Sequence, residues 1–270
     1  MENIEEIKNK LAKDMERMVK VIIREYGEFI PPEKLEFLKG IKDYNDVIKI
    51  KDTNTISMFA NNHEIILPLG AKKYFKYLKC IPLYGIKKNH AMYKPDEILN
   101  DHTYFDYINH VLLSGMSLYE FYLDTLLHET LHFCGSGMLG TALSEGFNEL
   151  KTRQIAKKYN LRASRCGYPK ETKIAFKLEQ LLGENIVSQI TFAKSESEVY
   201  EIIQNTYGED IAKQIFAISE KMNQELHAKY NHNDFNGIFA PLKKAIAYKK
   251  LNYDEVNNQI TYMASSSIKK

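Results

Sequence analysis

The sequence predicts an α+β fold that is predominantly helical, with a small sheet near its N-terminus. Apolar residues recur three and four positions apart through most of the 270 residues. Apolar and polar residues alternate only between residues 47 and 67. The chain is 44% hydrophobic and 27% charged, which is typical of a globular protein with a core. We expect an N-terminal lobe over residues 1–134 and a helical C-terminal lobe over residues 135–270.

Two helices are predicted before the sheet. Residues 3–26 place apolar side chains at helical spacing, with Glu, Lys and Asp between them, as in an amphipathic helix. Pro31 and Pro32 suit the start of a second, short helix that ends near Leu38, because proline is tolerated in the first helical turn.

The alternating segment predicts three strands, at 47–50, 56–60 and 64–67, with a tight turn over 61–63. Pro68 has no N–H to donate to a strand ladder, which suits the end of an edge strand.

Two further helices are predicted over residues 71–78 and 96–113. The segment from residue 70 to 94 is rich in Tyr and Lys, a mixture found on nucleic-acid surfaces but more often on a solvated amphipathic face. His102 and His110 lie in the second helix, where each either approaches a metal site or is a solvated or core-bonded histidine.

The most informative helix is predicted over residues 118–134. Ser117 and Glu120 have the spacing of a capping box, and Gly135 stands where helices commonly stop. The helix carries the run His128-Glu-Thr-Leu-His132, in which two imidazoles four residues apart share one face and are able to bind one metal ion.

A second helix, from about Leu143 to Tyr159, places Glu145 and Glu149 four residues apart on one face. Two histidines, one carboxylate and a water form a catalytic zinc site, so Glu145 is the predicted third ligand. Glu149 is predicted to accept a hydrogen bond from the free ring nitrogen of His128. The bare motif also arises by chance, and the alternative is an ordinary helix whose histidines are hydrogen-bonded.

The pair of motifs resembles the gluzincins, zinc metallopeptidases with a thermolysin-like core. The resemblance covers residues 117 to 172 and includes the run from Ser144-Glu145-Gly146 to Thr152. It implies one zinc ion per chain bound by His128, His132 and Glu145, with Glu129 as the general base and Glu149 as the partner of His128. Ser144 replaces the usual Asn, and the short distance in sequence from His132 to Glu145 is typical of a compact form.

The resemblance also implies that a small sheet precedes the motif helix and that its edge strand pairs with extended substrate. A strand within residues 56–67 is therefore the candidate floor of a peptide cleft, or else the hairpin merely caps the core.

Residues after the second motif helix supply candidates for binding substrate. A phenol is able to donate to the oxyanion of an attacked carbonyl, and small gluzincin-like sequences often carry the pair that Tyr168 and Glu171 resemble. The alternative for Tyr168 is a packed loop ring. Arg162 and Arg165 are weaker candidates for binding a substrate carboxylate.

The remaining sequence is helical in pattern. Helices are predicted over 174–182, 199–207, 211–226 and 239–248, separated by Gly183, Gly208 and Gly237. We expect this helical lobe to close one side of the cleft.

Charge and cysteine content limit the partners and the compartment. Lys and Arg number 37 against 35 for Asp and Glu, so no net field favours nucleic acid or a membrane. Cys80, Cys134 and Cys166 are odd in number and widely spaced, which favours a reducing compartment. No signal peptide or long apolar stretch is predicted, so we expect a cytoplasmic protein, with leaderless export left open.

The predicted activity is zinc-dependent hydrolysis of a peptide or protein substrate. Glu129 would take a proton from the attacking water and deliver it to the leaving amine. Two alternatives stay open, namely a zinc-containing domain that binds peptides or regulates without cutting, and a helical interaction protein without metal.

Overall fold

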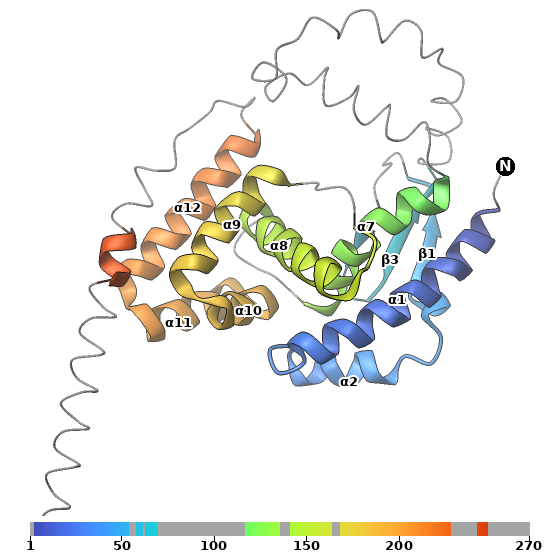
Figure 1. Ribbon diagram of the computed structural model, residues 1–270, viewed down its shortest axis with the longest axis horizontal. Coiled ribbons are helices and arrows are strands. Elements are labelled where there is room, and N and C mark those ends of the chain that lie inside the picture. The colour runs from blue at the N-terminus through green and yellow to red at the C-terminus, as the bar shows by residue number, and fades with distance from the viewer. Residues whose placement is uncertain are drawn as a thin grey trace, which may run out of the picture. The chain divides into compact units, whose positions relative to one another are not determined.

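The computed structural model describes residues 3–53, 58–61, 63–69, 117–135, 141–163, 168–227 and 242–247. In these ranges the chain is mostly helical with one three-stranded sheet, which confirms the predicted α+β class (Figure 1). The predicted helices at 71–78 and 96–113, with His102 and His110, lie outside the described residues. So do Arg165, Cys80 and Cys166.

Contacts divide the chain into two compact units. The first unit contains residues 1–136 and 148–167, and the second contains residues 137–147 and 168–270. One continuous helix, α8 (Thr141–Tyr159), contributes residues to both units.

The first unit begins with α1 (Ile4–Tyr26), whose apolar face is buried as the sequence predicts. The side chain of Asn3 caps it by accepting a hydrogen bond from the Glu5 N–H at 3.1 Å. A short helix, α2 (Pro32–Gly40), begins at a proline and is also as predicted. The 3₁₀ turn η1 (Tyr44–Asp46) then leads into the sheet.

The sheet has the strand order β1-β3-β2. Strand β1 (Ile48–Lys51) runs parallel to β3 (Ile65–Pro68), and β2 (Phe59–Ala60) pairs antiparallel with the other side of β3. The expectation that Pro68 ends an edge strand is wrong, because β3 is the central strand. Pro68 is its last residue, where the ladder stops, and its carbonyl accepts a hydrogen bond from the Tyr122 hydroxyl at 2.7 Å.

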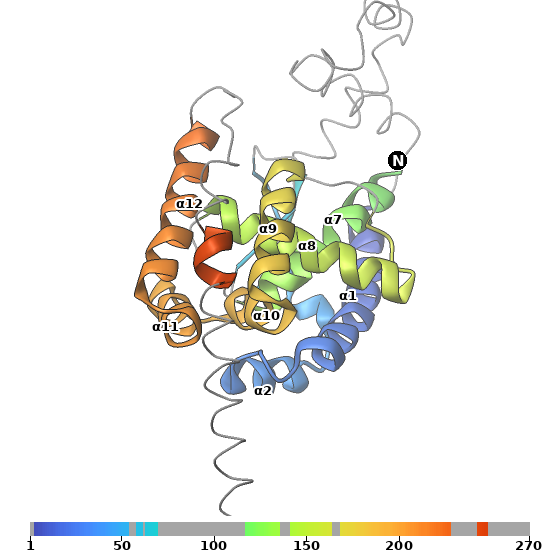
Figure 2. The ribbon, with the colours of Figure 1, turned by 60° about the vertical axis from the view of Figure 1, so that its left-hand side comes forward.

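Helix α7 (Leu118–Cys134) packs against α1, β2 and β3, and its place beside α1 is visible in Figure 2. The predicted capping box is present: the Glu120 N–H donates to Ser117 Oγ at 3.1 Å, and the Ser117 N–H donates to Glu120 Oε2 at 2.8 Å. Leu126 and Leu127 are fully buried. Each such side chain stabilises the fold by about 2 kcal/mol through burial, so this packing fixes the helix on the sheet.

Helix α8 begins two residues before the predicted Leu143 and ends at the predicted Tyr159. Asn160 then adopts a left-handed conformation with φ of 50°, and the Leu161 N–H donates to the Ala156 carbonyl at 3.0 Å. Asparagine tolerates this conformation better than most residues, so it ends the helix cleanly.

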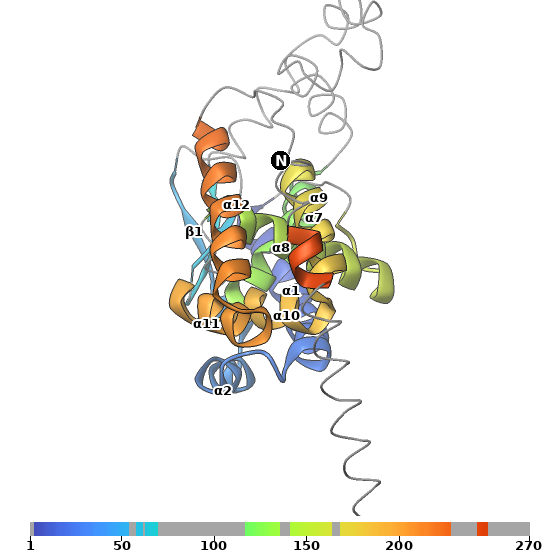
Figure 3. The same cartoon turned by 90° about the vertical axis from the view of Figure 1, so that its left-hand side faces the viewer.

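The second unit is helical, as Figure 3 shows. Three of its helices agree with the prediction: α9 (Pro169–Leu182), α11 (Glu196–Tyr207) and α12 (Glu209–His227). The sequence analysis missed α10 (Glu184–Phe192). Gly183 and Gly208 have φ of 90° and 93°, a region open to glycine, and each separates two successive helices. Residues 242–247, within the predicted 239–248 helix, are also helical.

In the part of the chain that the structure describes, no helix combines the length and the apolar character that crossing a bilayer requires.

Candidate metal centre

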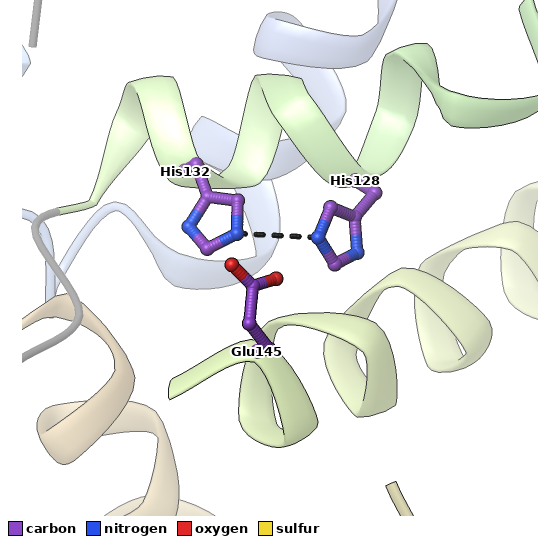
Figure 4. A group of neighbouring side chains, drawn as sticks. All are labelled: His128, His132 and Glu145. Atoms are coloured by element: carbon purple, nitrogen blue, oxygen red, sulfur yellow. Dashed lines mark hydrogen bonds between the residues drawn. The ribbon is translucent and has the colours of Figure 1, made fainter. Parts of the chain in front are cut away.

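Helix α7 brings the two histidines of the motif together. His128 and His132 lie one helical turn apart, and their Nε2 atoms face each other at 3.2 Å (Figure 4). His128 is buried, with 7% of its surface exposed, while His132 is half-buried. The packing of α7 on the sheet therefore presents both ring nitrogens on one side of the helix.

Helix α8 supplies the carboxylate. Figure 4 shows the side chain of Glu145 directed at the two rings, and one donor atom from each of His128, His132 and Glu145 lies within 4.8 Å of the others. Within the described ranges, no other group of three or more His, Cys, Asp and Glu residues has this arrangement. The structure thus brings together the three residues that the sequence analysis predicts as ligands.

The donor set fits a zinc ion. Zinc in proteins is usually tetrahedral, with bonds of about 2.0 Å to histidine nitrogen, so two ligand nitrogens lie about 3.3 Å apart. The observed separation of the Nε2 atoms, 3.2 Å, agrees with that geometry. Two nitrogens and one carboxylate oxygen leave a fourth position for water or substrate.

Glu149 lies beside His128, as predicted. Its Oε2 is 2.8 Å from His128 Nδ1, and the carboxylate is almost fully buried. Burial by itself would raise the pKa of Glu149, but the hydrogen bond with His128 and the charge of Arg153 outweigh it and lower the pKa. An ionised carboxylate only accepts hydrogen bonds, so Nδ1 is the donor in this contact. In a neutral imidazole the lone pair is then on Nε2, the atom that faces His132.

Asn148 is a second contact to His128 that the sequence analysis missed. Its Nδ2 donates to the His128 carbonyl at 2.8 Å, and its own carbonyl accepts from the Thr152 hydroxyl at 2.9 Å. Asn148 is 3% exposed. Two buried residues of α8 therefore contact His128, Asn148 at its backbone carbonyl and Glu149 at its ring. The sequence signal for this contact is the polar residue Asn148 directly before Glu149, in a helix predicted to pack beside the motif helix.

The predicted general base lies at the edge of the sheet. Glu129 Oε2 accepts a hydrogen bond from the Ala60 N–H at 2.9 Å, and Ala60 belongs to β2, which is an edge strand. The sequence analysis places a strand there but does not predict this contact, which joins residues 69 positions apart. The structure therefore places the Glu129 carboxylate at the edge of the described sheet, against β2.

No family model, curated protein or solved structure matches the chain. The chemistry proposed below therefore rests on the arrangement of its own side chains.

The close approach of α9 to α8 explains why a glycine, Gly146, follows the candidate ligand Glu145. A Cβ atom at this position would lie 2.5 Å from the Glu171 carbonyl oxygen, well inside van der Waals contact. The first turn of α9, which carries Glu171, therefore packs directly on the α8 backbone. Only glycine permits this close approach.

Tyr168 is the N-cap residue of α9 and is half-buried. Its carbonyl accepts hydrogen bonds from the Thr172 N–H at 2.9 Å and from the Thr172 hydroxyl at 2.6 Å. These contacts fix the main chain of the helix start. Donation by its phenol to an oxyanion stays a prediction.

Arg162 has protein partners. Its Nε donates to Asp124 Oδ1 at 2.8 Å and its Nη1 donates to Glu120 Oε1 at 3.0 Å. The Asp124 side chain is fully buried, and its hydrogen bond with Arg162 raises the pKa of the guanidinium. These contacts connect the segment after α8 to α7. The guanidinium of Arg162 therefore binds carboxylates of the protein itself, whereas the sequence suggested it as a ligand for a substrate carboxylate.

Proposed function

We propose that the protein is a zinc-dependent hydrolase of peptide bonds, similar in its core to the gluzincins. The observation that carries the proposal is the convergence of His128, His132 and Glu145, with donor atoms within 4.8 Å of one another. Glu129 directly follows His128 in the sequence, as in the His-Glu-x-x-His motif, and is the proposed general base.

The chain's own residues have separate tasks in the proposed reaction. A zinc ion held by His128, His132 and Glu145 would lower the pKa of water and polarise the substrate carbonyl. Glu129 takes the proton from the attacking water and delivers it to the leaving amine. The Ala60 N–H donates to Glu129 Oε2 and so holds that oxygen at the edge of the sheet. The Tyr168 phenol donates to the oxygen on which negative charge develops.

The proposed substrate is a peptide or protein in an extended conformation. Strand β2, an outer strand of the described sheet, would pair with such a chain through backbone groups other than the Ala60 N–H, and its contact with Glu129 would bring the scissile bond near the base. We propose a cytoplasmic location, because three widely spaced cysteines favour a reducing compartment, and Cys134 is a buried free thiol.

Metal analysis and a peptide digest test the proposal together. Purified wild-type protein should contain one zinc ion per chain, and His128→Ala and Glu145→Ala should lose it. Glu129→Gln should keep the metal, because glutamine preserves the shape of the side chain but does not take up a proton.

A mixed peptide library is then digested with each protein. Cleavage by the wild type and none by Glu129→Gln supports the peptidase. Zinc without cleavage would refute hydrolysis and favour the binding or regulatory domain, and absence of zinc would refute the metal centre itself.

A further inference from the structure

A chain of contacts continues beyond Glu149, away from the candidate metal centre. Arg153, one turn further along α8, donates from Nε to Glu149 Oε1 at 2.7 Å, and its Nη2 pairs with the same oxygen. Its Nη1 donates to the Ala163 carbonyl. The guanidinium therefore bridges the buried carboxylate and the segment that follows α8.

Both oxygens of Glu149 are engaged, each with a different partner. Oε2 meets His128 Nδ1, and Oε1 meets Arg153. A carboxylate held at both oxygens is fixed in its plane, whereas one held at a single oxygen is able to rotate about its last side-chain bond. The orientation that Glu149 offers to the imidazole thus depends on Arg153.

We infer that Arg153 is a positioning residue for the metal centre. It holds Glu149 in the orientation that keeps the proton on His128 Nδ1 and directs Nε2 toward the ion. The inference rests on the zinc site of the proposed function and extends it to Arg153, which contacts Glu149, the partner of His128.

Two other roles for Arg153 predict different results. If its charge acted only through space, it would repel a divalent cation, and its removal would strengthen zinc binding. If it only tied α8 to Ala163, its removal would destabilise the fold and leave zinc binding unchanged. Positioning alone predicts weaker zinc binding, so the sign of the change separates the three roles.

Arg162 offers a matched control. It is also an arginine of the first unit, it pairs with the buried Asp124 carboxylate, and it lies in the same segment as Ala163. Within the described part of the chain, its hydrogen bonds go to Asp124 and Glu120, whereas those of Arg153 go to Glu149 and Ala163. Arg162→Met therefore removes a comparable ion pair without loosening Glu149.

The experiment measures zinc affinity by competition with a chromophoric chelator. Partners of metal-binding histidines typically contribute about 10- to 100-fold in affinity, and we expect about tenfold weaker binding for Arg153→Met, one layer further out. Arg153→Lys keeps the positive charge but not the contact that two guanidinium nitrogens make with Glu149, so its loss of zinc affinity should be smaller. Arg162→Met should bind zinc like the wild type, although thermal unfolding of the metal-free proteins should show that both Met variants are destabilised.

A double variant tests the route through Glu149. If Arg153 acts by orienting Glu149, then Arg153→Met combined with Glu149→Gln should bind zinc as Glu149→Gln alone does, within about twofold. Unchanged or tighter binding by both Arg153 variants, or fully additive losses in the double variant, would overturn the inference while wild-type zinc binding still stands. A wild type that binds no zinc would overturn this inference and the proposed function together.

Discussion

The Ala60 N–H of strand β2 donates a hydrogen bond of 2.9 Å to Glu129 Oε2 on helix α7. A backbone donor has no side-chain freedom, so it fixes the carboxylate relative to the edge of the sheet. The position of the proposed base is thus set by the fold of the sheet as well as by its own helix.

Replacing Ala60 tests this contact. Ala60→Pro removes the N–H at an edge strand, where proline is tolerated, and should lower kcat of the proposed hydrolysis about tenfold with the zinc content unchanged. Ala60→Gly keeps the N–H and is the control. Equal rates for the proline and glycine variants would show that the donor has no role in the reaction.

Asn148 should contribute to stability through the His128 carbonyl. Asn148→Leu leaves that buried carbonyl without its 2.8 Å donor and should lower the free energy of unfolding of the metal-free protein by about 1–3 kcal/mol. Urea denaturation measures the change. Thr206→Ala removes an exposed hydroxyl contact within α11 and should change stability by no more than about 0.5 kcal/mol. A loss of the same size at both positions would contradict a special role for Asn148.

Two glycines with opposite surroundings give a second stability test. Gly146→Ala should destabilise the protein by about 1–3 kcal/mol, because its Cβ would lie 2.5 Å from the Glu171 carbonyl oxygen and a backbone would have to move. Gly40→Ala, at the end of α2, meets no atom within 4 Å and should be neutral or stabilising by at most about 1 kcal/mol. Thermal unfolding compares the two, and a Gly146→Ala protein as stable as Gly40→Ala would argue against the close approach of α9 to α8.

Acid should weaken the cap of α7. The Ser117 N–H lowers the pKa of Glu120 below its ordinary value of 4.5, and Arg162 adds to the effect. Because the pKa of Glu120 is lower in the folded protein than in the unfolded chain, its ionised form stabilises the fold. This stabilisation is complete above the pKa of the unfolded chain and is lost as the pH falls through the pKa of the folded protein. As the pH falls below 4.5, the stability of the wild type should therefore fall more steeply than that of Glu120→Gln. Denaturant unfolding at each pH measures both slopes, and parallel slopes would refute the contribution.

The sequence predicted the parts of the site that depend on local spacing. His128 and His132 are four residues apart, Ser117 and Glu120 are three apart, and a helix turns each spacing into one geometry. Helix α10 was missed because it has only nine residues and includes β-branched residues and Ser, so its helical pattern is weak.

The contacts that the sequence did not reveal join residues far apart along the chain. Ala60 meets Glu129 across 69 positions, and Asn148 meets the His128 carbonyl across 20. No periodicity in one segment encodes which backbone atom of another segment it will face. The central position of β3 was missed for the same reason, since β1 pairs with β3 and not with β2, the next strand along the chain.

Helix α8 carries Glu145, Asn148, Glu149 and Arg153 within three turns of one continuous rod. An added or deleted residue inside this stretch would rotate everything beyond it by about 100° and shift it by about 1.5 Å along the axis. Such a change would turn Glu149 away from His128 if Glu145 stayed in place. The stretch should therefore accept many exchanges of side chain but almost no change in its length.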